Sequence, residues 1–211
     1  MRNIEELVET LARDAAVVNP APHPYMLGMK WTAGAAIYLV LTLIVTGLRP
    51  DLMAKLHDPW FVAETAVLAV IFIATSLSAA LLSFPDLHQK RWVALAPALL
   101  FALFLLIIFL SWSADQPPAP PPAHTYECTT CIVLVALLPA AWIFHGMRKY
   151  ATTHYRLAGG IALLSALSIG ALWLRLHELN NSVAHVIEWH YLPMIVFAII
   201  GMWLGRVILK W

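Results

Sequence analysis

Long apolar runs separated by short polar segments dominate the chain. A helix needs about 20 mostly apolar residues to cross a bilayer, and six runs approach that length: Trp31–Leu48, Phe61–Phe84, Trp92–Trp112, Cys128–Phe144, Leu157–Leu176 and Trp189–Leu209. Several of them begin or end on tryptophan, as the aromatic belts of membrane proteins do. The pattern predicts an all-α, polytopic membrane protein whose residues 25–211 form a six-helix transmembrane bundle.

Residues 1–24 form a different segment. Apolar side chains recur there at the spacing of one helical face, namely at Ile4, Leu7, Val8, Leu11, Ala12 and Ala15. This predicts a short amphipathic cytoplasmic helix, followed by a proline-containing linker at 19–24. One interpretation is a surface helix on the bilayer or the cytoplasmic loops, and the other is a partner-docking helix. The acidic flanks Glu5, Glu6, Glu9 and Asp14 disfavour an anionic membrane surface and favour a protein partner.

Composition and charge agree with a lipid environment. Hydrophobic residues make up 61% of the chain and charged residues only 12%, about half the charged share of soluble domains. Ten of the thirteen Lys and Arg residues fall on the side of the predicted N-terminus. The positive-inside rule then places both termini in the cytoplasm, in a bacterial inner membrane. The net charge of +1 and the lack of a concentrated basic face argue against nucleic acid.

Metal-capable and thiol residues gather on the predicted outer face. They are His57, His124, Glu127, Cys128, Cys131, His177, Glu178, His185, Glu188 and His190. Imidazole, thiolate and carboxylate together suit zinc or copper. The Cys128–Cys131 spacing at a helix start fits a reversible disulfide, half of a metal site, or a structural role. If 182–190 is an α-helix, His185 and Glu188 share a face and His190 points elsewhere.

Two charged residues lie inside apolar runs near the outer side. Glu64 and Arg175 could pair at low dielectric, but snorkelling of both side chains to the interface is the interpretation we favour. The middles of the six runs lack acids and bases, which disfavours an ion-coupled transporter. Haem binding would need histidines paired across spans, whereas most histidines fall in loops or at span ends.

The main alternative from the residues is an enzyme. A membrane thiol oxidoreductase using Cys128 and Cys131 would suit a CxxC pair at an outer helix start. Such an enzyme usually needs a second cysteine pair to pass electrons onward, and the chain has only two cysteines. We therefore expect a non-enzymatic protein. The sequence is compatible with a monomer and with a homo-oligomer.

Several short motifs carry a resemblance to a known family. They are Leu7–Asp14 before the proline linker, Gly47–Leu52 after the first run, Asp58–Phe61 before the second, a cysteine at the start of the fourth, Leu176-His177, and the terminal Gly205–Trp211. In their order and spacing the chain resembles the NrsF family of six-span transmembrane anti-sigma factors.

The resemblance implies a stress-sensing regulator of transcription. The N-terminal segment, with Ile4, Leu7, Val8, Leu11 and Asp14, would bind an extracytoplasmic-function sigma factor and keep it at the membrane. Release would follow metal or oxidative stress, with two outer cysteines implicated. One of them matches Cys128 or Cys131, whereas the other tends to follow the Leu-His pair, where this chain has Glu178. The adjacent CxxC pair or a His/Glu metal site would then replace the usual two-cysteine switch.

Overall fold

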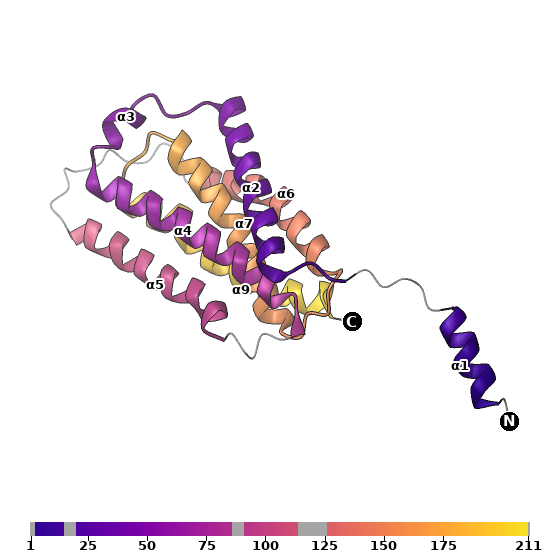
Figure 1. The fold of residues 1–211 in the computed structure, drawn as a ribbon. Helices are drawn as coiled ribbons and strands as arrows, with labels where there is room; N and C mark the ends of the chain where they lie inside the picture. The colour runs from indigo at the N-terminus through magenta and orange to yellow at the C-terminus, as the bar shows by residue number, and fades with distance from the viewer. Residues whose placement is uncertain (1–2, 15–19, 86–90, 114–125, 211) are drawn as a thin grey trace.

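A computed structural model describes residues 3–14, 20–85, 91–113 and 126–210, and all regular structure in them is helical. The elements, in chain order, are α1 (Ile4–Arg13), α2 (Pro24–Thr46), α3 (Leu52–Lys55), α4 (Pro59–Leu82), α5 (Arg91–Ser113), α6 (Tyr126–Met147), α7 (Tyr155–His177), α8 (Val183–His185), the π-turn (Val186–Tyr191) and α9 (Leu192–Ile208). The expectation of an all-α chain is confirmed (Figure 1).

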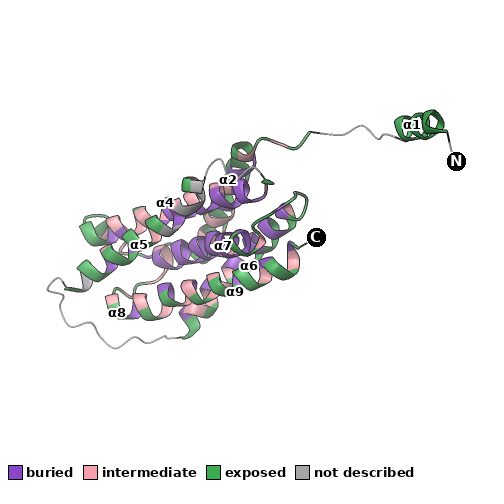
Figure 2. Ribbon diagram, turned by 90° about the horizontal axis from the view of Figure 1, so that it is seen from below, coloured by how far each residue is buried: buried purple, intermediate pink, exposed green. Residues whose placement is uncertain are grey.

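Helix α7 is the centre of the bundle. Nearly every residue from Ala158 to Arg175 is buried, and α2, α4, α6 and α9 all pack against it. Figure 2 shows this buried helix surrounded by helices whose outer faces are exposed. A helix that is apolar on all sides suits such a central position. Its few polar side chains find partners inside the bundle, as in the 2.8 Å contact between Ser76 Oγ and Ser165 Oγ.

Glycines set the close approach of α7 and α9. A Cβ atom at Gly201 would lie 2.6 Å from the Gly159 carbonyl oxygen, and one at Gly205 would collide with the Tyr155 carbonyl oxygen. Gly201 and Gly205 are four residues apart and so lie on one face of α9. Small residues at this spacing let two membrane helices pack backbone against backbone.

Five segments are long and apolar enough to cross a membrane: Pro24–Thr46, Pro59–Leu82, Tyr126–Met147, Tyr155–His177 and Val183–Ile208. The described apolar part of α5 is shorter, Leu99–Leu110, so the span expected at Trp92–Trp112 stays a prediction. Most boundaries lie within three residues of the expected ones, and two differ by six or more. The first span begins at Pro24, not Trp31, because proline is preorganised for the first helical position. The last begins at Val183, not Trp189, since α8 and the π-turn continue into α9.

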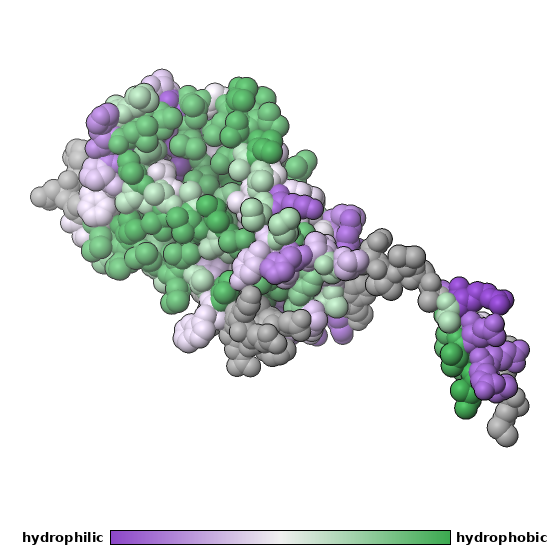
Figure 3. Space-filling model, viewed as in Figure 1, coloured by the Kyte–Doolittle hydropathy of each residue, from purple (hydrophilic) through white to green (hydrophobic). Residues whose placement is uncertain are grey.

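The bundle has two chemically different ends. At the site end, defined as residues 47–58, 126–131 and 175–191, the Arg49 amide donates to the Leu176 carbonyl at 2.9 Å and joins two connections. At the tail end, defined as residues 20–31, 146–156 and 205–210, the Trp31 ring lies against Gly146. The tail end carries the chain toward α1, which buries none of its residues. Figure 3 shows a largely hydrophobic bundle surface and, apart from it, α1 with one apolar and one polar face.

Candidate functional site

Four of the predicted outer residues meet at the site end. Cys128 lies in the first turn of α6, Glu178 directly follows α7, His185 ends α8, and His190 lies in the π-turn. One potential ligand atom from each lies within 4.8 Å of the others. Residues spaced over 63 positions of the chain thus converge because α6, α7 and the π-turn pack together.

The distances within this cluster are short. Cys128 Sγ lies 3.5 Å from Glu178 Oε1 and 3.4 Å from His185 Nε2. The Glu178 carboxylate is also 3.8 Å from His185 Nε2, and its other oxygen is 3.3 Å from His190 Nε2. The two imidazole rings meet edge to face, with their centroids 5.2 Å apart. The carboxylate therefore touches all three other members.

Burial leaves part of this polar cluster without partners. Cys128, His185 and His190 are buried, whereas Glu178 keeps 17% of its side chain exposed. Within the described part of the chain, His185 Nδ1 and both ring nitrogens of His190 make no hydrogen bond. The 3.3 Å contact between His190 Nε2 and Glu178 is therefore an ion-pair distance and not a hydrogen bond. Buried polar atoms without partners are uncommon in native proteins and call for an explanation.

Glu178 is ionised at neutral pH. Partial burial opposes its charge, but the contacts with His190, Cys128 and His185 outweigh burial and lower the pKa of the carboxyl below its ordinary value. The cluster therefore holds a fixed negative charge beside a thiol and two imidazoles. These are the donor types that bind borderline and soft metal ions.

The π-turn explains why His185 and His190 face the same cluster. In an α-helix, residues five apart point about 140° away from each other, which is why α-helical spacing paired His185 with Glu188 instead. A π-helix bonds residue i to i+5 and so brings these two histidines onto one side. Glu188 is exposed. The structure thus differs from the α-helical expectation at His190.

A proline and a threonine account for the π-turn. Pro193 has no amide hydrogen and its ring crowds the carbonyl four residues earlier, which belongs to Trp189. That carbonyl accepts a hydrogen bond from Thr129 Oγ1 at 2.6 Å instead. Thr129 directly follows Cys128, so this bond also fixes the start of α6 against the π-turn.

The other predicted site residues lie outside the four-residue cluster. Cys131 is partly buried against the core, and Glu127 is exposed on the first turn of α6. His177 Nδ1 lies 2.9 Å from the Gly47 carbonyl oxygen, and its ring stacks on Trp173. His124 falls outside the described residues.

A second buried polar group adjoins the cluster. Arg175 Nη2 donates to Glu64 Oε2 at 2.7 Å, and the Tyr191 hydroxyl donates to Glu64 Oε1. The expectation that Glu64 and Arg175 snorkel to the interface is wrong, since both side chains are buried within the bundle. Tyr191 was not predicted at all. It follows His190 directly, and no sequence signal separates it from other interfacial tyrosines.

Arg49 is a further residue that sequence reasoning counted only as an outer charge. Its buried guanidinium makes two contacts with Asp51, at 2.7 and 2.9 Å, and one with Asn181 Oδ1 at 3.0 Å. It also lies over the Phe61 ring, as does Arg175. The loop after α2 is thereby fastened to the loop that carries Glu178.

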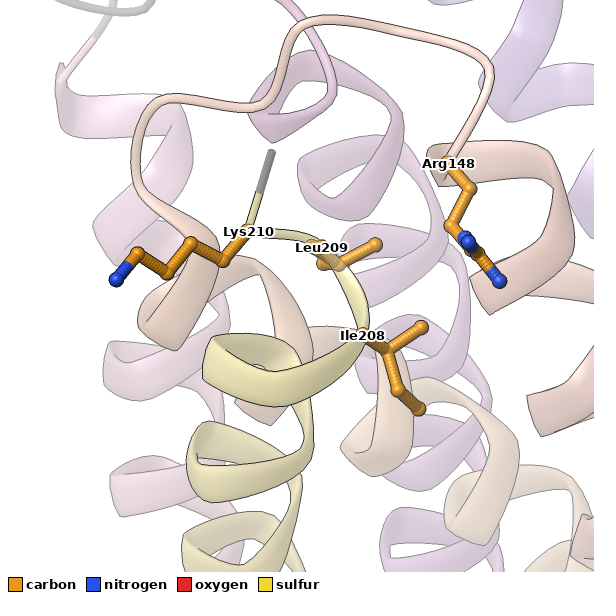
Figure 4. Close-up of a pocket in the computed structure, with 4 residues that line it drawn as sticks. All are labelled: Arg148, Ile208, Leu209 and Lys210. Carbon is orange, nitrogen blue, oxygen red and sulfur yellow. The ribbon is translucent and has the colours of Figure 1, made fainter.

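The tail end offers no comparable donor set. Figure 4 shows a small hollow lined by Arg148, Ile208, Leu209 and Lys210. The cationic side chains at its rim point away from each other (Figure 4). Among the described residues, the one group of His, Cys, Asp and Glu with metal-binding geometry is therefore that at the site end.

Comparison with known proteins gives the chain a family. The family described as NrsF, negative regulator of sigma F, matches residues 11–211. The probable anti-sigma-F factor NrsF of Azospira oryzae is 27% identical over 213 residues, which cover 98% of this chain and 99% of that protein. The anti-sigma-F factor NrsF of Caulobacter vibrioides is 27% identical over 215 residues, with the same coverage of both chains. No solved structure matches. Since the family match leaves out only the first ten residues, this chain belongs to the NrsF family of negative regulators of sigma F.

Proposed function

We propose that this protein is a transmembrane anti-sigma factor that binds an extracytoplasmic-function sigma factor through α1 and releases it when a metal or redox signal reaches the site end. Two relatives that span nearly the whole chain are named anti-sigma-F factors. The protein has six spans, with α5 as the third, in the bacterial inner membrane. Both termini and the tail end face the cytoplasm, and the site end faces outward. It is a regulator and not an enzyme.

The exposed apolar face of α1 is the observation that carries the proposal. Ile4, Leu7, Val8 and Leu11 are 77, 47, 59 and 63% exposed, although they line one side of a regular helix. An isolated helix of this length is marginal in water and gains stability when its apolar face is covered. The acidic residues on its other faces, with Asp14 at its end, suit a protein surface with basic rims.

Orientation follows from the charges at the two ends. The tail end carries the exposed cations Lys30, Arg148, Lys149, Arg156, Arg206 and Lys210. Cations next to membrane spans are retained in the cytoplasm. Because α1 leads into the tail end, it lies on the side where a sigma factor and RNA polymerase are found.

The test is co-purification of the full-length protein with a co-expressed sigma factor. Removing residues 1–18 should abolish binding while membrane insertion persists. Leu7→Asp and Leu11→Asp should each weaken binding by tenfold or more, because a hot-spot apolar residue contributes at least about 1.4 kcal/mol.

Matched controls lie on the polar side of the same helix. Glu5→Gln and Glu6→Gln change charge without changing the apolar face, and should alter the affinity less than either aspartate substitution. Full binding by the protein without residues 1–18 would refute docking through α1. Capture of a thiol substrate on Cys128, with no sigma factor bound, would instead favour an oxidoreductase.

A further inference from the structure

Several contacts within the site-end cluster are close to the ligand spacing of a tetrahedral metal shell, and one ligand atom from each residue lies within 4.8 Å of the others. Zinc bonds of about 2.3 Å to sulfur and about 2.0–2.1 Å to nitrogen or oxygen place neighbouring ligand atoms about 3.3–3.6 Å apart. Contacts of 3.3, 3.4, 3.5 and 3.8 Å join Cys128, His185, His190 and the two carboxylate oxygens of Glu178. We propose that these four residues bind one divalent cation of the zinc class.

Ligand atoms without other partners support this assignment. His190 Nε2 faces Glu178 but makes no hydrogen bond with any described residue, and the ring is fully buried. A network of hydrogen bonds alone would leave this buried nitrogen unsatisfied, which is unfavourable. A cation between Cys128, Glu178 and the two histidines gives His190 Nε2 the partner that it lacks and replaces the hydrogen bonds of Cys128 with a bond to the metal.

Charge balance selects a divalent ion. One thiolate, one carboxylate and two neutral imidazoles together carry a charge of minus two, so a divalent cation leaves a neutral site. Neutrality matters here because three of the four ligands are buried, and an uncompensated buried charge is costly. A monovalent copper ion would leave one negative charge. When the ion binds, the Cys128 proton passes to water as the sulfur–metal bond forms.

Access and selectivity follow from the exposed part of the site. Glu178 is the only one of the four ligands with a substantial exposed fraction, so its carboxylate is the first that an incoming cation meets. The shell is closed by four protein ligands, as in structural zinc sites, and has no open position for catalysis. The arrangement therefore suits a metal ion that acts on the conformation of the protein and not one that takes part in a reaction.

The π-turn connects this site to the buried core. His190 is followed by Tyr191, whose hydroxyl donates to Glu64 on α4, and Glu64 in turn pairs with Arg175 on α7. A ligand that moves His190 therefore also acts on the packing of α4 against α7. The link from metal binding to sigma release rests on the proposed function, whereas metal binding itself does not.

The experiment is a zinc titration of the purified full-length protein in detergent, in competition with a chromophoric chelator. We expect one zinc ion per chain. Cys128→Ser and His190→Gln should weaken binding roughly tenfold or more. Cys131→Ser and His177→Gln, a thiol and an imidazole outside the cluster, are the matched controls and should leave the affinity unchanged.

Cobalt substitution gives a readout that does not depend on variant stability. Co²⁺ in the unmodified protein should show the near-ultraviolet band of a thiolate ligand and the intense visible bands of tetrahedral coordination. Cys128→Ser should lose the thiolate band and Cys131→Ser should keep it. Absence of zinc binding, a binding preference for copper(I) only, or equal losses in the two cysteine variants would overturn the proposal.

The same assays distinguish failure of the metal-site proposal from failure of the proposed function. Protein without residues 1–18 should bind zinc with unchanged affinity and no sigma factor. Unmodified protein that binds the sigma factor but no zinc would overturn the metal site alone. Protein that binds zinc but no sigma factor would overturn the proposed function alone.

Discussion

The two ends of the bundle handle positive charge in opposite ways. At the site end, Arg49 and Arg175 are buried and Lys55 is half-buried, and each contacts a carboxylate at 2.7–3.0 Å. At the tail end, the six cations named above are all exposed, and no described residue of that end is an Asp or Glu. Helix contact there depends on glycines such as Gly159 and Gly205 instead.

Charge therefore has a different role at each end of this bundle. In the proposed orientation, the exposed tail-end cations keep that end in the cytoplasm and leave a surface that a partner can approach. Paired site-end charges determine how the loops and helix ends fit together, because Arg49 and Arg175 hold their partners at low dielectric. A signal that alters one site-end contact must therefore rearrange others.

Glu64→Leu should have the largest effect on stability. It leaves the buried Arg175 guanidinium without its carboxylate, and such a loss typically costs about 3–5 kcal/mol. The free energy of unfolding, measured by denaturant titration in detergent micelles, should fall by that amount. Arg206→Gln at the tail end removes an exposed cation and should change it by no more than about 0.5 kcal/mol.

The double variant Glu64→Leu, Arg175→Met tests the cause. Replacing both charges with apolar groups removes the unpaired ion, so most of the lost stability should return. If the double variant is as unstable as Glu64→Leu alone, the ion pair is not what holds α4 to α7.

The sequence predicted the helices better than their ends. Apolar length was enough to identify five of the spans, because hydrocarbon thickness sets the required number of residues. The start of the last span was missed because α8 and the π-turn contain His185, Glu188 and His190, which lower the local hydropathy. His185 and His190 are nevertheless buried beside Cys128 and Glu178, and a pattern along one chain contains no information about that packing.

The site was predicted as a set of candidates and not as a geometry. Residue type alone nominated Cys128, Glu178, His185 and His190 together with six others. Their convergence depends on the register of the π-turn, which Pro193 and Thr129 set from outside the candidate set. The partners of Glu64 were equally hidden, because Tyr191 lies 127 positions away in the sequence.

Tyr191→Phe should have the next largest effect. It deletes the hydroxyl that donates to Glu64 and leaves one carboxylate oxygen without its donor. Hydrogen bonds to charged groups contribute about 1.5–3 kcal/mol, and the loss should appear in the same unfolding titration. Tyr126→Phe, on an exposed residue of α6 at the same end, is the size-matched control. Equal losses in the two variants would contradict a special role for Tyr191.

Gly205→Val tests the packing that replaces charge at the tail end. The added atoms collide with the Tyr155 carbonyl and Gly159, so α9 must move away from α7. Overpacking of this kind costs about 1–3 kcal/mol. Val207→Leu enlarges a residue that is 60% exposed on the same helix and should be nearly neutral. A neutral Gly205→Val would show that α7 and α9 separate at no cost.

Asp51→Asn should give the smallest effect, one that is present at neutral pH and disappears in acid. Hydrogen bonds from Arg49 lower the pKa of the Asp51 carboxyl below its ordinary value. A group whose folded pKa is depressed stabilises the protein above its unfolded pKa, about 3.9, and loses that contribution as the pH falls through the folded pKa. The unfolding free energies of the two proteins should therefore differ at neutral pH and converge in acid. With Arg49→Met as background the same substitution should have little effect at any pH, because the guanidinium that depresses the pKa is gone. A difference that persists in that background would assign the effect to another partner of Asp51.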